Sequence, residues 1–110
     1  MKQGEIWDLY LNPTKGSEQS GRRPAVIISG NMLNKYLQVV IVCPLTTSIK
    51  NYKGNLILKP NATNGLLKIS EVLTFHVRSV SKTRLENKIG QIPLKDVESI
   101  KKTLNDILKY

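Results

Sequence analysis

Residues 37–43, Leu-Gln-Val-Val-Ile-Val-Cys, are the most strongly strand-like stretch of the chain. Branched aliphatic side chains favour extended backbone and pack well on a pleated surface. A second run of this kind, residues 24–29, precedes it, and Gly30-Asn31 separates the two. Residues 44–48, which begin with Pro44 and turn polar, close the strand. We therefore expect a sheet built around these two strands.

Weaker patterns on either side extend the expected sheet. Residues 5–11 place Trp7, Leu9 and Leu11 on one face of an extended segment. Residues 14–23 contain no apolar side chain, so we expect them to form an exposed loop, a kind of segment that often carries function. Further strands are expected at 56–58, 70–80 and 84–89, with a turn at 61–65 and a turn or single helical turn at 81–84.

The C-terminal segment changes to the spacing of a helix. Its apolar residues recur three or four positions apart, at Leu94, Val97, Ile100, Leu104, Ile107 and Leu108. Pro93 precedes them, and Asp96 and Glu98 fall in the first turns, where the helix dipole favours anions. The sequence therefore predicts one amphipathic helix packed on five or six short strands, as a strongly bent antiparallel sheet or open barrel.

Length and charge limit the class of protein. With 110 residues the chain has the size of a single domain, 1–110. It carries 17 Lys and Arg against 8 Asp and Glu, a net charge of +9 spread over both halves. Such an excess attracts nucleic acid or an acidic protein segment, although a generally basic surface is the plain alternative. No apolar run has the length of a membrane span or signal peptide, so we expect a cytoplasmic protein.

The residue counts exclude several common sites. A single cysteine, Cys43, excludes an intrachain disulfide and a multi-cysteine zinc site, and its apolar strand favours a core role. A single histidine, His76, excludes a pair of imidazoles. No carboxylate cluster or glycine-rich phosphate loop is present, so neither a metal nor a cofactor is expected. The loop 15–23, with three cations, one carboxylate and two glycines, remains the candidate site, or else a solvated hairpin loop.

This loop and its flanks resemble a known family. Pro13-Thr14-Lys15-Gly16-Ser17-Glu18-Gln19, then Gly21-Arg22-Arg23-Pro24 and the strand after it, are similar to the MazF/PemK toxins, ribosome-independent endoribonucleases of toxin–antitoxin pairs. The resemblance extends through Gly4-Glu5-Ile6-Trp7 and Cys43-Pro44-Leu45-Thr46-Thr47, and more weakly through Val77-Arg78-Ser79, Arg84-Leu85 and the helix. It therefore covers nearly the whole chain.

The resemblance implies a fold, a site and partners. The fold is mainly β with helices (α+β), a small SH3-like barrel of the CcdB/Kid type that acts as a homodimer with a basic groove for single-stranded RNA. Arg23 matches the family's catalytic arginine and Thr46 its active-site threonine. The expected RNA-binding residues are Lys15, Glu18, Gln19, Arg22, Thr47, His76 and Arg78. The expected partner is an acidic antitoxin, and the toxin–antitoxin complex would bind DNA.

The identity of the general base stays open. Many family members have Asp-Gln where we align Phe75-His76, and in some of them that aspartate is assigned as the base. Either the base lies elsewhere or Arg23 and Thr46 suffice. His76 is then a proton shuttle, an RNA-facing polar residue, or only a hydrogen-bonding strand residue. Tyr36 and Tyr52 are candidates for stacking on bases.

The implied activity is metal-independent cleavage of single-stranded RNA, in particular mRNA, by its own 2′-OH. The enzyme must supply a proton acceptor, a proton donor and positive charge at the phosphate, and the products are a 2′,3′-cyclic phosphate and a 5′-OH. Two alternatives remain: a gyrase-binding toxin of the same fold, which would lack the arginine–threonine pair, and a non-catalytic RNA-binding module, for which basic charge suffices.

Overall fold

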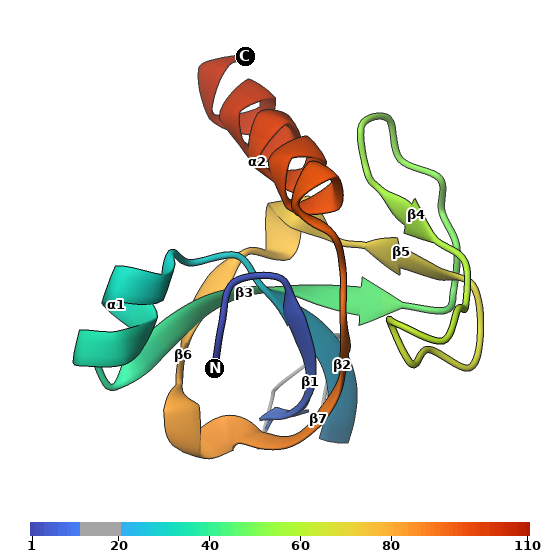
Figure 1. The fold of residues 1–110 in the computed structure, drawn as a ribbon. Coiled ribbons are helices and arrows are strands. Elements are labelled where there is room, and N and C mark those ends of the chain that lie inside the picture. Colours follow the sequence, from blue (N-terminus) through green and yellow to red (C-terminus); the bar gives the residue numbers. More distant parts are fainter. Residues whose placement is uncertain (12–20) are drawn as a thin grey trace.

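The structure, a computed structural model, describes residues 1–11 and 21–110, without the side chain of Leu11. Seven antiparallel strands form one sheet in the order β4-β5-β3-β2-β1-β7, with β6 also paired to β3. The sheet curls into a half-barrel, and the C-terminal helix lies above it (Figure 1). The strands are β1 (Glu5–Leu11), β2 (Gly21–Ile27), β3 (Val39–Thr46), β4 (Ile57–Leu58), β5 (Ser70–Val72), β6 (Arg78–Ser81) and β7 (Leu85–Gln91). The helices are α1 (Asn31–Tyr36), the 3-10 turns η1 (Thr74–His76) and η2 (Lys82–Arg84), and α2 (Leu94–Lys109).

The end of β2, residues 25–27, and most of β3 are buried on both faces, which explains their aliphatic runs. Successive side chains of a strand point to opposite sides. Val26 and Cys43 join a hydrophobic cluster together with Val97 and Ile100 of α2. Ala25, Ile27, Val40 and Val42 join a second cluster with Leu9, Val80 and Leu85 from the curled part of the sheet. The predicted fold class, a bent antiparallel sheet with a packed C-terminal helix, is confirmed.

The strand predicted at 70–80 is wrong, although both of its ends do pair with β3. β5 pairs with Leu45 and Thr46, and β6 pairs with residues 39–42 on the same edge. Between them η1 interrupts the extended backbone, and its closing bonds run from the N–H of His76 to the carbonyl of Leu73 and from that of Val77 to Thr74. Apolar–polar alternation continues through the turn, so the sequence pattern does not reveal it.

Three further elements differ from the prediction. β3 continues through Pro44 to Thr46, because residues 44–46 pair with β2 and β5, whereas the sequence predicted its close from Pro44. β2 begins at Gly21, because its antiparallel ladder with β1 continues through Arg23 opposite Leu9, and the predicted loop 14–23 therefore ends earlier. α1 was not predicted, since six residues are too few for a periodic pattern. Its buried Asn34 donates from Nδ2 to the carbonyl of Ser29 at 2.9 Å, which fixes the helix to the end of β2.

The helix α2 begins after Pro93, as the sequence indicates, and buries Val97, Ile100 and Thr103 toward the sheet. All four of its lysines are exposed. The predicted apolar face is buried at Val97 and Ile100 and partly at Leu104, whereas Leu94, Ile107 and Leu108 are exposed. Among the described residues, no helix combines the length and apolar character that crossing a membrane requires.

Candidate active site

The register of the sheet brings the predicted catalytic pair together. Ala25 of β2 lies opposite Pro44 of β3 in the antiparallel ladder. Continuing this register by two residues places Arg23 beside Thr46, with both side chains on the same face. Thr46 in turn lies opposite Glu71 of β5. Arg23, Thr46 and Glu71 therefore form a row across three neighbouring strands.

A cavity of about 330 Å³ opens over this row. Its walls come from the ends of β2 and β3, the segment after β3, and the turn η1. The described residues that line it are Arg23, Thr46, Ser48, Lys50, Tyr52, Leu73, Phe75 and His76. Arg23 is half-buried and Thr46 is 9% exposed, so a guanidinium and a hydroxyl face one small space beside the Lys50 side chain. Such a set of donors and charges suits a phosphate group.

The hydroxyl of Thr46 is oriented by the backbone. Its Oγ1 accepts a hydrogen bond from the N–H of Ser48 at 3.1 Å. A hydroxyl that accepts in this way still has its own proton to donate. No described residue takes that proton, so the hydroxyl can donate into the cavity.

Aromatic rings form one side of the cavity. The rings of Tyr52 and Phe75 meet edge to face with centroids 5.5 Å apart, and Phe75 and His76 do the same at 4.4 Å. About half of the Tyr52 and Phe75 surfaces remains exposed, at 50% and 48%. Exposed rings beside a cationic cavity are suited to stacking on unpaired bases. Tyr36, the other stacking candidate, lies on α1 next to Lys35 and outside the described lining of this cavity.

The remaining predicted RNA-binding residues are not all gathered here. His76 lines the cavity, whereas Arg78 is exposed on β6 opposite Val42. Thr47 lines a different cavity, of about 470 Å³, with Asp8, Pro24 and Lys68. Arg22 is paired with Glu86 of β7, with Nη2 2.5 Å from Oε2. Lys15, Glu18 and Gln19 lie outside the described residues.

Glu71, which lies opposite Thr46 on β5, was missed by sequence reasoning. Its side chain is fully buried beneath the segment 50–55. Burial alone would raise the pKa of Glu71, but hydrogen bonds from Asn55 and from three backbone N–H groups outweigh it and lower the pKa. The sequence around Glu71 carries no signal of this role, because its partners are groups some twenty positions away. Phe75 and His76, which the sequence placed in a strand over 70–80, lie in η1 instead.

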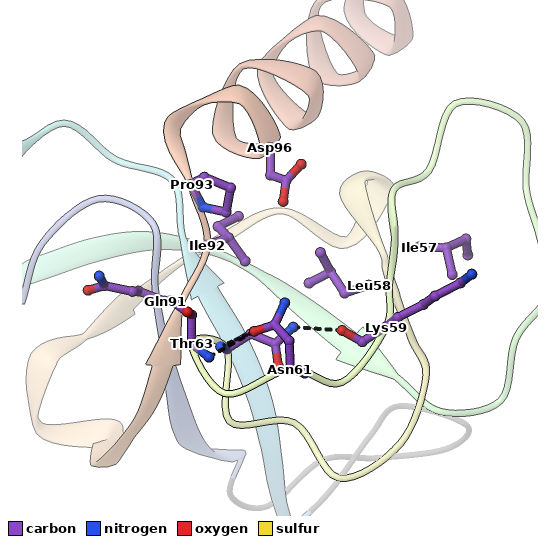
Figure 2. A pocket seen from close by; sticks show the side chains of 10 residues that line it. Ile57, Leu58, Lys59, Asn61, Thr63, Gln91, Ile92, Pro93 and Asp96 are labelled. Carbon is purple, nitrogen blue, oxygen red and sulfur yellow. Dashed lines mark hydrogen bonds between the residues drawn. The ribbon is translucent and has the colours of Figure 1, made fainter.

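Larger cavities lack this combination of groups. One of about 580 Å³ lies between β4, the turn 61–65, the end of β7 and the start of α2 (Figure 2). The amide of Asn64 is used internally there: Nδ2 donates to the carbonyl of Lys59 at 2.9 Å, and Oδ1 accepts from the N–H groups of Asn61 and Leu66. Lys59 and Asp96 are its charged groups among the described lining residues.

Neither a metal cluster nor a reactive thiol is found in the described part of the chain. No three His, Cys, Asp or Glu side chains there are arranged to hold a metal ion. Cys43 is fully buried, and burial raises the pKa of its thiol to about 12. Because the thiolate is the nucleophilic and metal-binding form, Cys43 is a core residue as the sequence indicated.

The sequence of the chain is similar to a known protein family and to characterised proteins. Residues 2–108 match the family described as the PemK-like, MazF-like toxin of type II toxin–antitoxin systems. The chain is 32% identical over 104 residues to the endoribonuclease toxin MazF of Escherichia coli K12, which covers 94% of this chain and 88% of that protein. It is 29% identical over 109 residues to the endoribonuclease MazF9 of Mycobacterium tuberculosis, covering 94% and 92%.

Solved structures show the same fold. The crystal structure of MazF from Deinococcus radiodurans superimposes with a TM-score of 0.83 and 27% identity, covering all of this chain and 97% of that one. MazF in a MazE–MazF crystal structure from the same organism superimposes with a TM-score of 0.79 and 28% identity, covering 98% and 95%. The half-barrel and its C-terminal helix therefore belong to a fold already seen in MazF alone and in a MazE–MazF crystal structure.

Proposed function

The chain belongs to the PemK-like, MazF-like toxin family of type II toxin–antitoxin systems, and we propose that it cuts single-stranded RNA in the cavity around Arg23 and Thr46. It is an endoribonuclease of the MazF type. The observation that supports this site is the convergence of a half-buried guanidinium and an oriented hydroxyl on one small cavity. The single domain 1–110 carries the activity.

The reaction uses the substrate's own nucleophile. The 2′-OH of one nucleotide attacks the adjacent phosphorus in line with the departing 5′-oxygen, which leaves a 2′,3′-cyclic phosphate. The departing 5′-oxygen takes a proton from water and becomes the 5′-OH. Negative charge grows on the phosphate oxygens during this step. Arg23 binds those oxygens with its fixed positive charge, and Thr46 donates its hydroxyl proton to one of them.

The proton of the 2′-OH needs an acceptor in the same space. Imidazoles exchange protons near neutral pH, and His76 is the described lining residue that carries one. Glu71 does not serve, because hydrogen bonds occupy both of its oxygens. We therefore assign the role of proton acceptor to His76, and leave the binding of flanking nucleotides to the predicted residues Lys15, Glu18, Gln19, Arg22, Thr47 and Arg78.

The partners follow from charge and from the relatives. A net charge of +9 favours an acidic protein segment as well as RNA, and the solved MazE–MazF complexes show that MazF toxins bind an antitoxin. We propose that this chain is a cytoplasmic homodimer, that an acidic antitoxin segment covers its basic face, and that the complex binds DNA. Free of its antitoxin, it would arrest growth by cutting mRNA.

Two neighbouring arginines provide a matched test. Arg23→Ala and Arg22→Ala each remove one positive charge from β2, but only Arg23 lines the cavity. With a long natural RNA and mapped 5′ ends, the wild type should give discrete cuts with 5′-hydroxyl ends. Arg23→Ala should slow cleavage by about 10²–10³-fold, as for the loss of one transition-state donor. Arg22→Ala should keep the cleavage rate at saturating RNA.

The outcomes separate the alternatives. Full activity of a folded Arg23→Ala protein rejects the assignment of Arg23. Wild-type protein that binds RNA without cutting it is a non-catalytic binding module, and inhibition of gyrase without any cut identifies the gyrase-binding alternative.

A further inference from the structure

The cavity has one wall with no regular secondary structure. Lys50 and Tyr52 line the cavity from the segment 48–55, which joins β3 to β4 and is exposed along most of its length. Its backbone is irregular, with positive φ at Asn51 (55°) and Gly54 (89°). Such a segment holds a fixed shape only where other parts of the protein satisfy its polar groups.

Glu71 satisfies four of them. Its Oε1 accepts hydrogen bonds from the N–H groups of Lys50 at 2.7 Å and Asn51 at 2.8 Å. Its Oε2 accepts from the N–H of Tyr52 at 3.0 Å and from Nδ2 of Asn55 at 2.9 Å. One carboxylate therefore binds three consecutive backbone N–H groups and the side chain that follows them.

A second contact holds the far end of the segment. The hydroxyl of Thr103 on α2 donates to the carbonyl of Gly54 at 2.5 Å. A Cβ on Gly54 would lie 3.3 Å from Cγ2 of Thr103, so helix and segment are in close contact. The wall is thus attached to β5 at one end and to α2 at the other.

The burial of Glu71 indicates that its carboxylate does more than fill space in the core. Its side chain is 0% exposed, and burying a charge is costly unless charge-assisted hydrogen bonds surround it. It lies directly opposite Thr46, yet all its acceptor positions point to the segment. A carboxylate placed here fixes the wall relative to the pair of residues that face the phosphate.

We propose that Glu71 is a positioning residue, which holds Lys50 and Tyr52 at the cavity so that they bind the nucleotide next to the scissile phosphate. Lys50 pairs with that nucleotide's phosphate, and the exposed ring of Tyr52 stacks on its base. This inference rests on the proposed function and adds to it a residue that touches neither substrate nor reacting atoms.

The substitution Glu71→Gln separates positioning from chemistry. Glutamine has the same shape, but its NH₂ group replaces one carboxylate oxygen and faces two donors. Two of the four hydrogen bonds to the segment are therefore lost. Arg23 and Thr46 stay on their strands. We expect KM and the Kd for an uncleavable RNA, with 2′-deoxyribose at the cut site, to rise about tenfold, since one stacked base contributes in that range. We expect kcat to change by less than about threefold.

Electrostatics alone predicts the opposite change in Kd for Glu71→Gln. Removing a negative charge from the protein would strengthen RNA binding. The matched control is Glu86→Gln, which removes an equal charge from β7 outside the described lining of the cavity. It should bind the uncleavable RNA as tightly as the wild type or more tightly.

A double-variant cycle shows whether Glu71 acts through the wall. In a Tyr52→Ala background, Glu71→Gln should weaken binding much less than in the wild type, because the ring that it positions is gone. The proposal would be overturned if Glu71→Gln raised the Kd by the same factor in the wild-type and Tyr52→Ala backgrounds. An unchanged Kd in folded Glu71→Gln would also overturn it. If Glu71→Gln does not fold, the test uses Asn55→Ala, which removes one of the four hydrogen bonds to Glu71. A raised Kd in this variant supports the proposal, and an unchanged Kd overturns it.

The same experiment keeps the two proposals apart. A wild type that cuts the RNA, with additive effects in the cycle, retains the nuclease and rejects the role of Glu71. A wild type that does not cut rejects the proposed function, whatever the cycle shows.

Discussion

Replacing Thr46 with valine removes one hydroxyl group from the candidate site and changes little else. Valine has nearly the same shape, and the residue is 9% exposed in β3, so the strand should persist. The lost acceptor leaves the N–H of Ser48 to water, since Ser48 is exposed, at a stability cost of about 1 kcal/mol. We expect the catalytic loss to be larger, because in the proposed reaction the hydroxyl donates to a phosphate oxygen that gains charge in the transition state.

The expected size follows from that single bond. A hydrogen bond to a charged group contributes about 1.5–3 kcal/mol. Since about 1.4 kcal/mol corresponds to a tenfold change in rate, kcat should fall about 10- to 150-fold. Thr46→Ser keeps the hydroxyl and should retain kcat within about threefold, because the acting group is preserved.

Single-turnover cleavage of a short RNA that contains one mapped cut site gives these rates. Thr47→Val is the matched control: it makes the same chemical change one residue away, where the side chain lines a different cavity. Any effect of Thr47→Val should fall on RNA binding and leave kcat unchanged. If Thr46→Val is folded and cuts at the wild-type rate, or if Thr46→Ser is as slow as Thr46→Val, the hydroxyl has no part in the reaction.

Three further outcomes are expected. Chelation by EDTA should leave the cleavage rate unchanged, because the proposed step uses only the 2′-OH and side chains; a loss that magnesium restores would contradict it. Hydrogen bonds lower the pKa of Glu71, so its contribution to stability is present above its ordinary pKa of about 4.3 and is lost as the pH falls through the lowered value. Thermal unfolding between pH 7 and pH 3 should therefore show a smaller loss of Tm in Glu71→Gln, and an equal loss would refute this account of the carboxylate. Cys43, with its pKa raised to about 12, should resist a chromogenic disulfide at pH 8 until denaturant is added, and rapid reaction of the folded protein would show that it is accessible.

Much of the fold can be predicted because buried strands and helices space their apolar residues periodically in the sequence. Strands β1 and β3 and helix α2 show this spacing, since each presents aliphatic residues to a core at the period of its own backbone. The turn η1 leaves no such signal, because Thr74, Phe75 and His76 keep the alternation of the strands around them. The length of β2 was missed for another reason: its first residues are held by pairing with β1 rather than by a core.

The site was only partly predictable for similar reasons. Family resemblance identified Arg23 and Thr46, but the residues alone do not show that they meet, because this depends on the register between β2 and β3. Lys50 and Ser48 reach the cavity from an irregular segment, whose path no local pattern encodes. Glu71 looks like an ordinary strand residue in the sequence, and only the N–H groups of a segment some twenty positions away show its use.

The most direct test of the account uses an RNA with a single 2′-deoxyribose at the nucleotide that precedes the mapped cut. The substrate keeps the phosphate that we propose Arg23 and Thr46 bind, and it loses only the nucleophile. We predict that this RNA binds with nearly the affinity of the all-ribose strand and is not cut, while the all-ribose strand yields an upstream fragment with the mass of a 2′,3′-cyclic phosphate. Cleavage of the deoxy-substituted strand at the same bond would contradict the proposed reaction.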